Sequence, residues 1–274
     1  LYLGCTYGIR ARIDLARKEW LNVLYSSYKG YKKIKQSEKL NPKQSDIYMP
    51  IGLLEYFAGM SPMPVKILAN LFGITPDTEL GIIHLEAAID AKSYSWIESA
   101  NVLTYCWLYF ENDVEKAEKL SFELMNNFPL NPLFRILYAE ALLRQGKLKK
   151  IEEILSFYEN KIPSYPPILK NECELKIKYL NSILAFQLND YQSALYNLQW
   201  IENNYQMEMD WLLGLTWLLK AKIFDIYNDR MYAVDYYEKA AKLDNSFAYI
   251  NWAKGYCKKP YSGMKDDPYF QLDY

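Results

Sequence analysis

The chain has 274 residues, 51% hydrophobic and 24% charged, which is typical of a folded globular protein with a sizeable core. A formal net charge of −1 excludes a global electrostatic field that would draw the protein to nucleic acid or to a membrane surface. No apolar run approaches the ~18 residues that a membrane span needs, and the four cysteines contain no C-x-x-C pair of a metal or redox motif.

Charge is distributed unevenly along the chain. Residues 1–45 carry ten Lys and Arg against three Asp and Glu, whereas residues 46–146 carry six against thirteen. Such blocks are typical of solvated faces that pack beside one another, and a basic docking patch in the first block stays open as an alternative. The sequence predicts no nucleic-acid partner.

Helical periodicity, broken by proline, glycine and asparagine, runs through the chain without the alternation that indicates a strand. The first helices expected cover residues 1–26, 28–40 and 65–72, with another running from a cap at Ser45 or Asp46 through Tyr56. The segment that begins Thr75-Pro-Asp-Thr-Glu predicts a further helix start. Thr75 is its expected cap, with proline at the first helical position and acids in the first turn.

From residue 94 onward the predicted helices form pairs joined by short turns. The pairs are 94–110 with 114–128, 132–145 with 147–161, 168–188 with 191–205, and 210–227 with 231–243. A last helix over 246–257 lacks a partner and is expected to cap the array. The segment after Pro260 is expected to be irregular. The pattern predicts an all-α fold.

Small or apolar residues recur at one position of the second helix of each pair. They are Gly81, Ala117, Ile151, Ala194 and Ala233, with spacings of 36, 34, 43 and 39 residues. The first helices carry Ala139, Ser182 and Ala221 at the corresponding position. Close packing explains this pattern, because the helices of a hairpin approach one another where side chains are small.

This period resembles the tetratricopeptide repeat, with Trp217 at the tryptophan of the repeat and Pro129 and Pro163 at its closing proline. The resemblance covers roughly residues 95–257. It implies a right-handed α-α superhelix of about six helical hairpins, with Ile151 and the long helix at 168–188 as departures. It implies one domain over 1–274, with divergent hairpins in 1–92, clearer repeats and a capping helix in 93–257, and an irregular tail in 258–274.

Several phrases in residues 1–130 resemble a group of bacterial tetratricopeptide proteins whose function is mostly unassigned. They are LGCTYGIRAR from Leu3, YKGY from Tyr28, LNP from Leu40, DIYMPIG from Asp46, EYFAGMSP from Glu55 and FPLNP from Phe128. Members of that group often carry a signal peptide. The resemblance therefore implies a periplasmic or secreted bacterial protein in preference to a cytoplasmic one, and it implies no chemistry.

Catalytic chemistry has little support in the sequence. The single histidine, His84, is followed by Leu-Glu and not by the E-x-x-H of a zinc protease. A nucleophilic dyad of Cys106 and His84 is the sharpest alternative, but no motif supplies an orienting group or an oxyanion hole. We expect His84 to be a hydrogen-bonded or solvent-facing helix residue, and we expect no catalytic residues.

Paired acids offer a second route to chemistry. They occur at Asp77 with Glu79, at Glu111 with Asp113 and at Asp266 with Asp267. The first two pairs stand at predicted helix starts, where carboxylates interact favourably with the helix dipole. Neither a calcium-loop pattern nor a glycine-rich phosphate cradle is present. The sequence predicts no metal site and no cofactor.

Binding is the function that the repeat architecture favours, because the first helices of stacked hairpins line a surface that accepts extended partners. The repeat register places six side chains as exposed positions on that concave surface: Tyr109, Glu140, Arg144, Lys176, Tyr179 and Lys222. The three cations are suited to clamping a partner carboxylate and the two tyrosines to stacking on the partner.

The sequence therefore predicts a non-catalytic scaffold that binds a protein or peptide partner of unknown identity. Two alternatives remain open. One is a structural subunit of a bacterial envelope assembly. The other is a carbohydrate-binding or carbohydrate-processing protein that uses the surface of its 26 tyrosines and seven tryptophans. The oligomeric state is not predicted.

Overall fold

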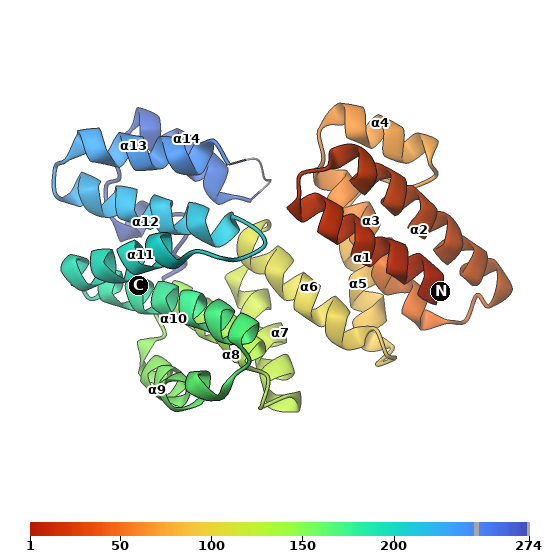
Figure 1. Ribbon diagram of the computed structural model, residues 1–274, viewed down its shortest axis with the longest axis horizontal. Helices are drawn as coiled ribbons and strands as arrows, with labels where there is room; N and C mark the ends of the chain where they lie inside the picture. The colour runs from red at the N-terminus through yellow and green to blue at the C-terminus, as the bar shows by residue number, and fades with distance from the viewer. Residues whose placement is uncertain (244–246, 273–274) are drawn as a thin grey trace. The chain divides into compact units, whose positions relative to one another are not determined.

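The computed structural model describes residues 1–243 and 247–272, and in these ranges all regular structure is helical (Figure 1). The all-α prediction is confirmed. The chain divides into two compact units, Leu1–Leu103 and Thr104–Tyr274. The single domain expected for 1–274 stays a prediction. Within the described ranges, no helix combines the length and the apolar character that a membrane crossing requires.

The first unit begins with five α-helices and ends within a sixth. They are α1 (Tyr2–Ala16), α2 (Trp20–Leu40), α3 (Tyr48–Met60), α4 (Met63–Leu71), α5 (Thr78–Asp90) and the start of α6 (Trp96–Tyr109), with a 3-10 turn, η1 (Ser45–Ile47), before α3. The expected helix over 1–26 is wrong, because Lys18 takes a left-handed conformation with φ of 58° and reverses the chain. Residues 15–20 contain no proline, glycine or asparagine that would predict this break.

Close approaches of backbone hold these helices in pairs. A Cβ atom on Gly30 would lie 3.0 Å from the carbonyl oxygen of Gly4, so α1 and α2 touch at glycine. A Cβ on Gly81 would lie 2.7 Å from the carbonyl oxygen of Gly52, which joins α5 to α3 in the same way. The expected cap at Thr75 is wrong: Asp77 caps α5, and its carboxylate accepts a hydrogen bond from the Leu80 amide at 3.1 Å.

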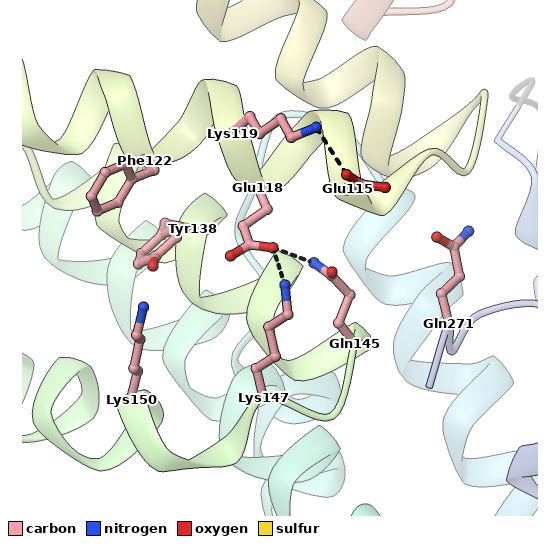
Figure 2. Close-up of a pocket in the computed structure, with 9 residues that line it drawn as sticks. All are labelled: Glu115, Glu118, Lys119, Phe122, Tyr138, Gln145, Lys147, Lys150 and Gln271. Carbon is pink, nitrogen blue, oxygen red and sulfur yellow. Dashed lines mark hydrogen bonds and ion pairs between the residues drawn. The ribbon is translucent and has the colours of Figure 1, made fainter. Parts of the chain in front are cut away.

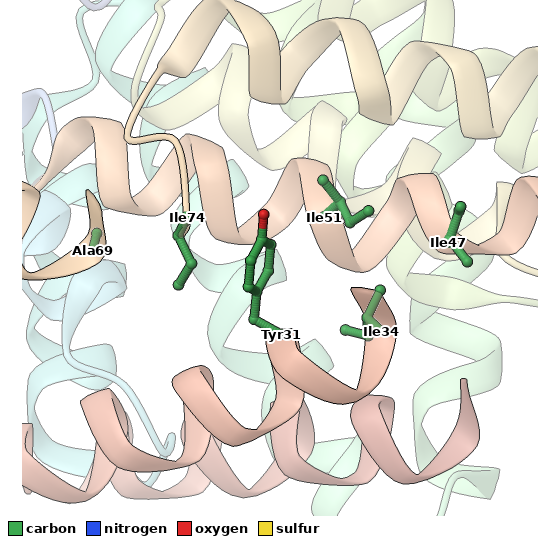
Figure 3. Packing of buried hydrophobic residues seen from close by; sticks show 6 residues of the cluster. All are labelled: Tyr31, Ile34, Ile47, Ile51, Ala69 and Ile74. Carbon is green, nitrogen blue, oxygen red and sulfur yellow. The ribbon is translucent and has the colours of Figure 1, made fainter. Parts of the chain in front are cut away.

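The apolar core of the first unit lies between α2, α3 and α4. Its buried members are Tyr31, Ile34, Ile47, Ile51, Ala69 and Ile74. In Figure 3 Tyr31 and Ile34 extend from α2 toward the region of Ile51 and Ile47, and Ile74 approaches from the loop that precedes α5. Burial of such side chains contributes roughly 1.5–3 kcal/mol each for the larger ones.

The second unit contains the end of α6 and the remaining helices. They are α7 (Val114–Asn127), α8 (Pro132–Arg144), α9 (Ile151–Lys161), α10 (Pro167–Gln187), α11 (Tyr191–Asn204), α12 (Trp211–Ile226), α13 (Arg230–Ala241) and α14 (Tyr249–Lys258), with 3-10 turns η2 (Leu148–Lys150), η3 (Ile162–Ser164) and η4 (Met264–Asp266). Packed neighbours include α7 with α8, α8 with α10, and each consecutive pair from α10 to α14. Such nearest-neighbour packing is typical of a helical solenoid.

A repeated turn explains why the helices of this unit alternate in direction. Three turns place an asparagine in the left-handed conformation, with φ of 57° to 61° at Asn112, Asn189 and Asn228. Asparagine tolerates this conformation better than most residues. The aspartate that follows each one, at positions 113, 190 and 229, then caps the next helix through its carboxylate.

The small residues predicted at helix contacts are fully buried. Ala117, Ala194 and Ala233 are inaccessible in the second helices, as are Ala139 and Ala221 in the first. The expected helix over 147–161 starts later than predicted, because residues 148–150 form η2. The expected last helix is α14, and its predicted start at Ser246 lies outside the described residues.

Residues 259–272, called the tail below, follow α14. Apart from η4 they contain no helix or strand, so the predicted irregular structure is confirmed for this range. Irregular does not mean exposed, because Tyr261, Asp267, Tyr269 and Phe270 are buried.

Candidate functional site

The six side chains predicted for the concave surface converge in the second unit. Tyr109 comes from the end of α6, Glu140 and Arg144 from α8, Lys176 and Tyr179 from α10, and Lys222 from α12. We call these six residues the tail-binding face. The prediction that they are exposed is wrong: none is more than 4% accessible. The tail packs against four of them, Glu140, Arg144, Tyr179 and Lys222. Side chains of the helices, among them Tyr105 and Trp211, cover Tyr109 and Lys176.

Lys222 holds the tail through a carboxylate. Its Nζ donates to both carboxylate oxygens of Asp267, at 2.8 Å and 2.7 Å, and neither side chain has appreciable contact with solvent. Aromatic rings surround the ammonium group, with the centroids of Tyr261 and Tyr269 each 5.5 Å from Nζ. The cation is thus satisfied by the tail.

Arg144 holds the tail through its backbone and one ring. Its Nε donates to the carbonyl oxygen of Tyr269 at 2.9 Å, and its guanidinium carbon lies 4.3 Å from the centroid of that ring. The carbonyl oxygen of Arg144 accepts a hydrogen bond from the Gln271 amide at 2.7 Å. The other guanidinium nitrogens donate to the carbonyl of Leu108 and to the side chain of Asn112, so residues outside the tail also hold the arginine.

Glu140 and Tyr179 recognise the hydroxyl of Tyr269. That hydroxyl lies 3.1 Å from Oε1 of Glu140, and it also hydrogen-bonds with Tyr179. The second oxygen of Glu140 accepts from the Tyr109 hydroxyl at 2.6 Å. Lys176 makes its hydrogen bonds within the helices, to Tyr105 and Glu172, so it supports the face without touching the tail through them.

Burial controls the protonation of the face. It raises the pKa of the Glu140 carboxyl, an effect that the charge of Arg144 and the hydroxyl of Tyr109 oppose. It also raises the pKa of Tyr269, which therefore keeps its proton for Glu140. Burial lowers the pKa of Lys222, although the charge of Asp267 counteracts the shift.

Little space is left between Tyr269 of the tail and the helices. The gap bounded by Leu108, Arg144, Leu215 and Tyr269, among others, has no room for a water molecule. At Tyr269 the tail is therefore closely packed against α8 and α12.

Sequence reasoning missed the tail residues that occupy the face. In the sequence, Asp267 stands out only as half of an acid pair, and Tyr269 and Phe270 fall in the segment predicted to be irregular. A signal was available: the face carries three predicted cations, and the segment Asp-Asp-Pro-Tyr-Phe has complementary charge and aromatic rings.

An open hollow of about 640 Å³, shown in Figure 2, lies between α7, the segment after α8, and Gln271 of the tail. Four of its charged groups form two pairs. Glu118 accepts from Gln145 at 2.9 Å and from Lys147 at 2.5 Å, and Lys119 pairs with Glu115 at 2.8 Å. These carboxylates are occupied by local partners, so the hollow offers no unpaired acid and base at those positions.

The residues considered for catalysis have structural partners or are buried. Nδ1 of His84 lies 2.6 Å from Oε2 of Glu55, and its ring stacks on Tyr48 with centroids 5.8 Å apart. Burial raises the pKa of Glu55, and the hydrogen bond from His84 opposes this shift. Cys106 is inaccessible to solvent. Asp77 and Asp113 cap α5 and α7, as expected for acids at helix starts.

Comparison of the chain with protein-family models, with curated proteins and with solved structures found no significant match.

Proposed function

We propose that the chain is a non-catalytic, protein-binding scaffold of the tetratricopeptide type, with the tail-binding face as its binding site. One observation carries the proposal: Arg144 and Lys222, two cations withdrawn from water, direct hydrogen bonds to a peptide segment of the chain itself. A face with these contacts has the chemistry needed to hold a segment from another protein.

The composition of the face supports recognition more than simple stabilisation. Removing an ion pair from water costs free energy that its mutual attraction only partly offsets, and apolar side chains of similar volume often stabilise a core as well or better. If position 222 contributed only to stability, a leucine there would stabilise the helices as well as the lysine does. Charged and hydroxyl groups at fixed positions select instead which segment binds.

The state of the ionisable groups supports a non-catalytic role. Glu140 and Asp267, the buried carboxylates at the face, are both engaged by hydrogen bonds from neighbouring side chains. His84 is engaged by Glu55. A general acid or base needs access to a substrate proton, which these contacts do not leave open.

A selection from a random peptide library tests the proposal. The bait is the full chain with Asp267→Ala and Tyr269→Ala, called the tail-weakened variant, which loosens the tail and leaves the face unchanged. The matched control carries Lys222→Ala in addition. We expect peptides that the bait retains and the control loses. Equal retention by the two baits, or no enrichment on either, would contradict the proposal.

A further inference from the structure

We propose that the tail-binding face recognises a β-turn of the type acid-proline-aromatic-aromatic, and that the chain's own turn Asp267-Pro268-Tyr269-Phe270 is a resident occupant that a partner segment must displace. This inference rests on the proposed binding function and specifies its ligand. The partner is a protein segment of this chemistry, and the tail regulates access to the site.

The occupant is a turn and not the extended strand that the repeat architecture suggests. The amide of Phe270 donates to the carbonyl oxygen of Asp267 at 3.1 Å, which closes a four-residue turn. The amide of Tyr269 donates to the Asp267 carboxylate at 3.1 Å. Pro268 has the fixed φ that the second position of such a turn favours. A turn organised by its own sequence loses less conformational entropy on binding.

Three side chains of the turn, those of Asp267, Tyr269 and Phe270, have separate partners on the helices. Lys222 binds both oxygens of Asp267, which selects an acid. The carboxylate of Glu140 accepts from the Tyr269 hydroxyl, which selects tyrosine over phenylalanine. Phe270 stacks on Phe186 of α10, with centroids 5.9 Å apart and an angle of 6° between the planes. The three contacts together define an order of acid, tyrosine and aromatic ring.

The helices contact the turn through its backbone as well. Asn112, from the left-handed turn before α7, donates from its side chain to the Pro268 carbonyl at 2.8 Å. Arg144 accepts from the Gln271 amide and donates to the Tyr269 carbonyl. Backbone contacts of this kind are available to any segment that forms the same turn, so they provide affinity without restricting the partner to this sequence.

The connection from α14 to the turn is anchored at buried Tyr261, whose amide donates to the Asp225 carboxylate at 2.8 Å, so the turn would leave by moving the chain beyond Tyr261. The segment between α14 and the turn includes exposed Ser262, Lys265 and Asp266, and α14 packs against α13 and α12. A short tether gives an intramolecular ligand an effective concentration in the millimolar range. A free partner therefore competes with a concentrated occupant, and weakening the tail should raise the apparent affinity of the site.

Fluorescence anisotropy with a labelled peptide of residues 259–272 measures this competition. The proteins are the wild-type full chain, the tail-weakened variant, and the tail-weakened variant with Lys222→Ala. We expect the peptide to bind the tail-weakened variant at least about tenfold more tightly than the wild type, because its competitor is removed. The addition of Lys222→Ala should abolish that gain, as should a peptide in which alanine replaces the acid of the turn. Equal affinity for wild type and the tail-weakened variant would overturn the inference.

A second protein protects the test against a folding failure of the tail-weakened variant, which circular dichroism and a cooperative melt would reveal. A protease site inserted after Ser262 allows the tail to be cut while it remains in place. The labelled peptide should then exchange into the cut wild-type sequence, and unlabelled peptide should chase it out. Absence of exchange over a range of peptide concentrations in which the cut tail itself dissociates would refute the inference.

The two proposals fail in distinguishable ways. Face-dependent peptides from the random library, together with no binding of the tail peptide, would leave the scaffold function standing and refute the turn as its ligand. Absence of both would refute both.

Discussion

Lys222 and Asp267 form an ion pair whose side chains are 1% and 0% exposed, and 45 residues separate them in the chain. One partner lies in the last third of α12 and the other in a segment without regular structure. This pair joins the helical hairpins to the tail and places a carboxylate where the repeat architecture predicts that a ligand binds.

Replacing Lys222 tests what the pair contributes. In Lys222→Ala, Asp267 must stay buried without its cation or leave the face together with the tail. We expect the free energy of unfolding to fall by up to about 3–5 kcal/mol, and we expect amide hydrogen exchange throughout 259–272 to accelerate.

Lys220 provides the matched control on the same helix. It is also a buried lysine, but its Nζ contacts Glu202 at 2.6 Å, Gln199 at 2.9 Å and Tyr236 at 2.9 Å, none of which belongs to the tail. In Lys220→Ala the protein should lose stability while the tail keeps its protection from exchange. Loss of tail protection in both variants would show that the tail responds to general destabilisation.

Removing both charges should restore the tail. In the double variant Lys222→Met/Asp267→Asn the asparagine keeps an acceptor for the Tyr269 amide, and no unpaired charge stays buried. Replacing a buried pair with uncharged groups of similar volume is often neutral or stabilising. We expect stability within about 1–2 kcal/mol of the wild type, measured by urea denaturation, and slow exchange in the tail. Stability as low as that of Lys222→Ala would mean that the cation has a role beyond its partner.

The pH dependence of the free energy of unfolding should reveal proton binding by the Glu140 carboxyl group. Its folded-state pKa lies above the ordinary value of 4.5, so the folded protein binds this proton more tightly than the unfolded chain does. The stabilising contribution is complete below pH 4.5 and is lost as pH rises through the folded pKa. In Glu140→Gln the free energy of unfolding should fall less steeply in that window. Denaturation between pH 4 and 7 gives the comparison, and parallel curves for Glu140→Gln and wild type would contradict it.

In the first unit, the imidazole of His84 is the hydrogen-bond partner of the Glu55 carboxyl group. Removal of the imidazole in His84→Ala leaves a carboxylate that is 4% exposed without its 2.6 Å partner. We expect a loss of about 1–3 kcal/mol, the usual cost of an unsatisfied buried polar group. Glu86→Ala, an exposed position on the same helix, should stay within about 0.5 kcal/mol of the wild type. Equal effects of the two substitutions would remove the structural role assigned to the pair.

Local signals account for the parts of the fold that the sequence predicts. The Asn-Asp phrase at 112–113, 189–190 and 228–229 marks a turn and a cap at once, because both functions depend on neighbouring residues. Small residues such as Ala117 and Ala194 mark the helix contacts through their volume. The break at Lys18 escapes prediction, because lysine has no special preference for a left-handed conformation.

The site was predictable only in part. The register of the first helices places the six residues of the tail-binding face on one side, and the structure brings them together. What covers that side depends on contacts such as Arg144 with Tyr269, which are 125 residues apart and have no periodic signal. Exposure inferred from a repeat register is therefore wrong here, because a segment outside the repeats occupies the surface.

Hydrogen exchange at the Gln271 amide is the most direct test that the tail-binding face is a binding site with a resident occupant. This amide donates to the carbonyl oxygen of Arg144 at 2.7 Å only while the tail is docked. In the wild-type chain alone it should exchange slowly. An excess of unlabelled peptide of residues 259–272 should accelerate its exchange, while the amides of helices α10 and α12 keep their exchange rates. An unchanged rate at saturating peptide would contradict the account, because the tail would then be a fixed part of the fold.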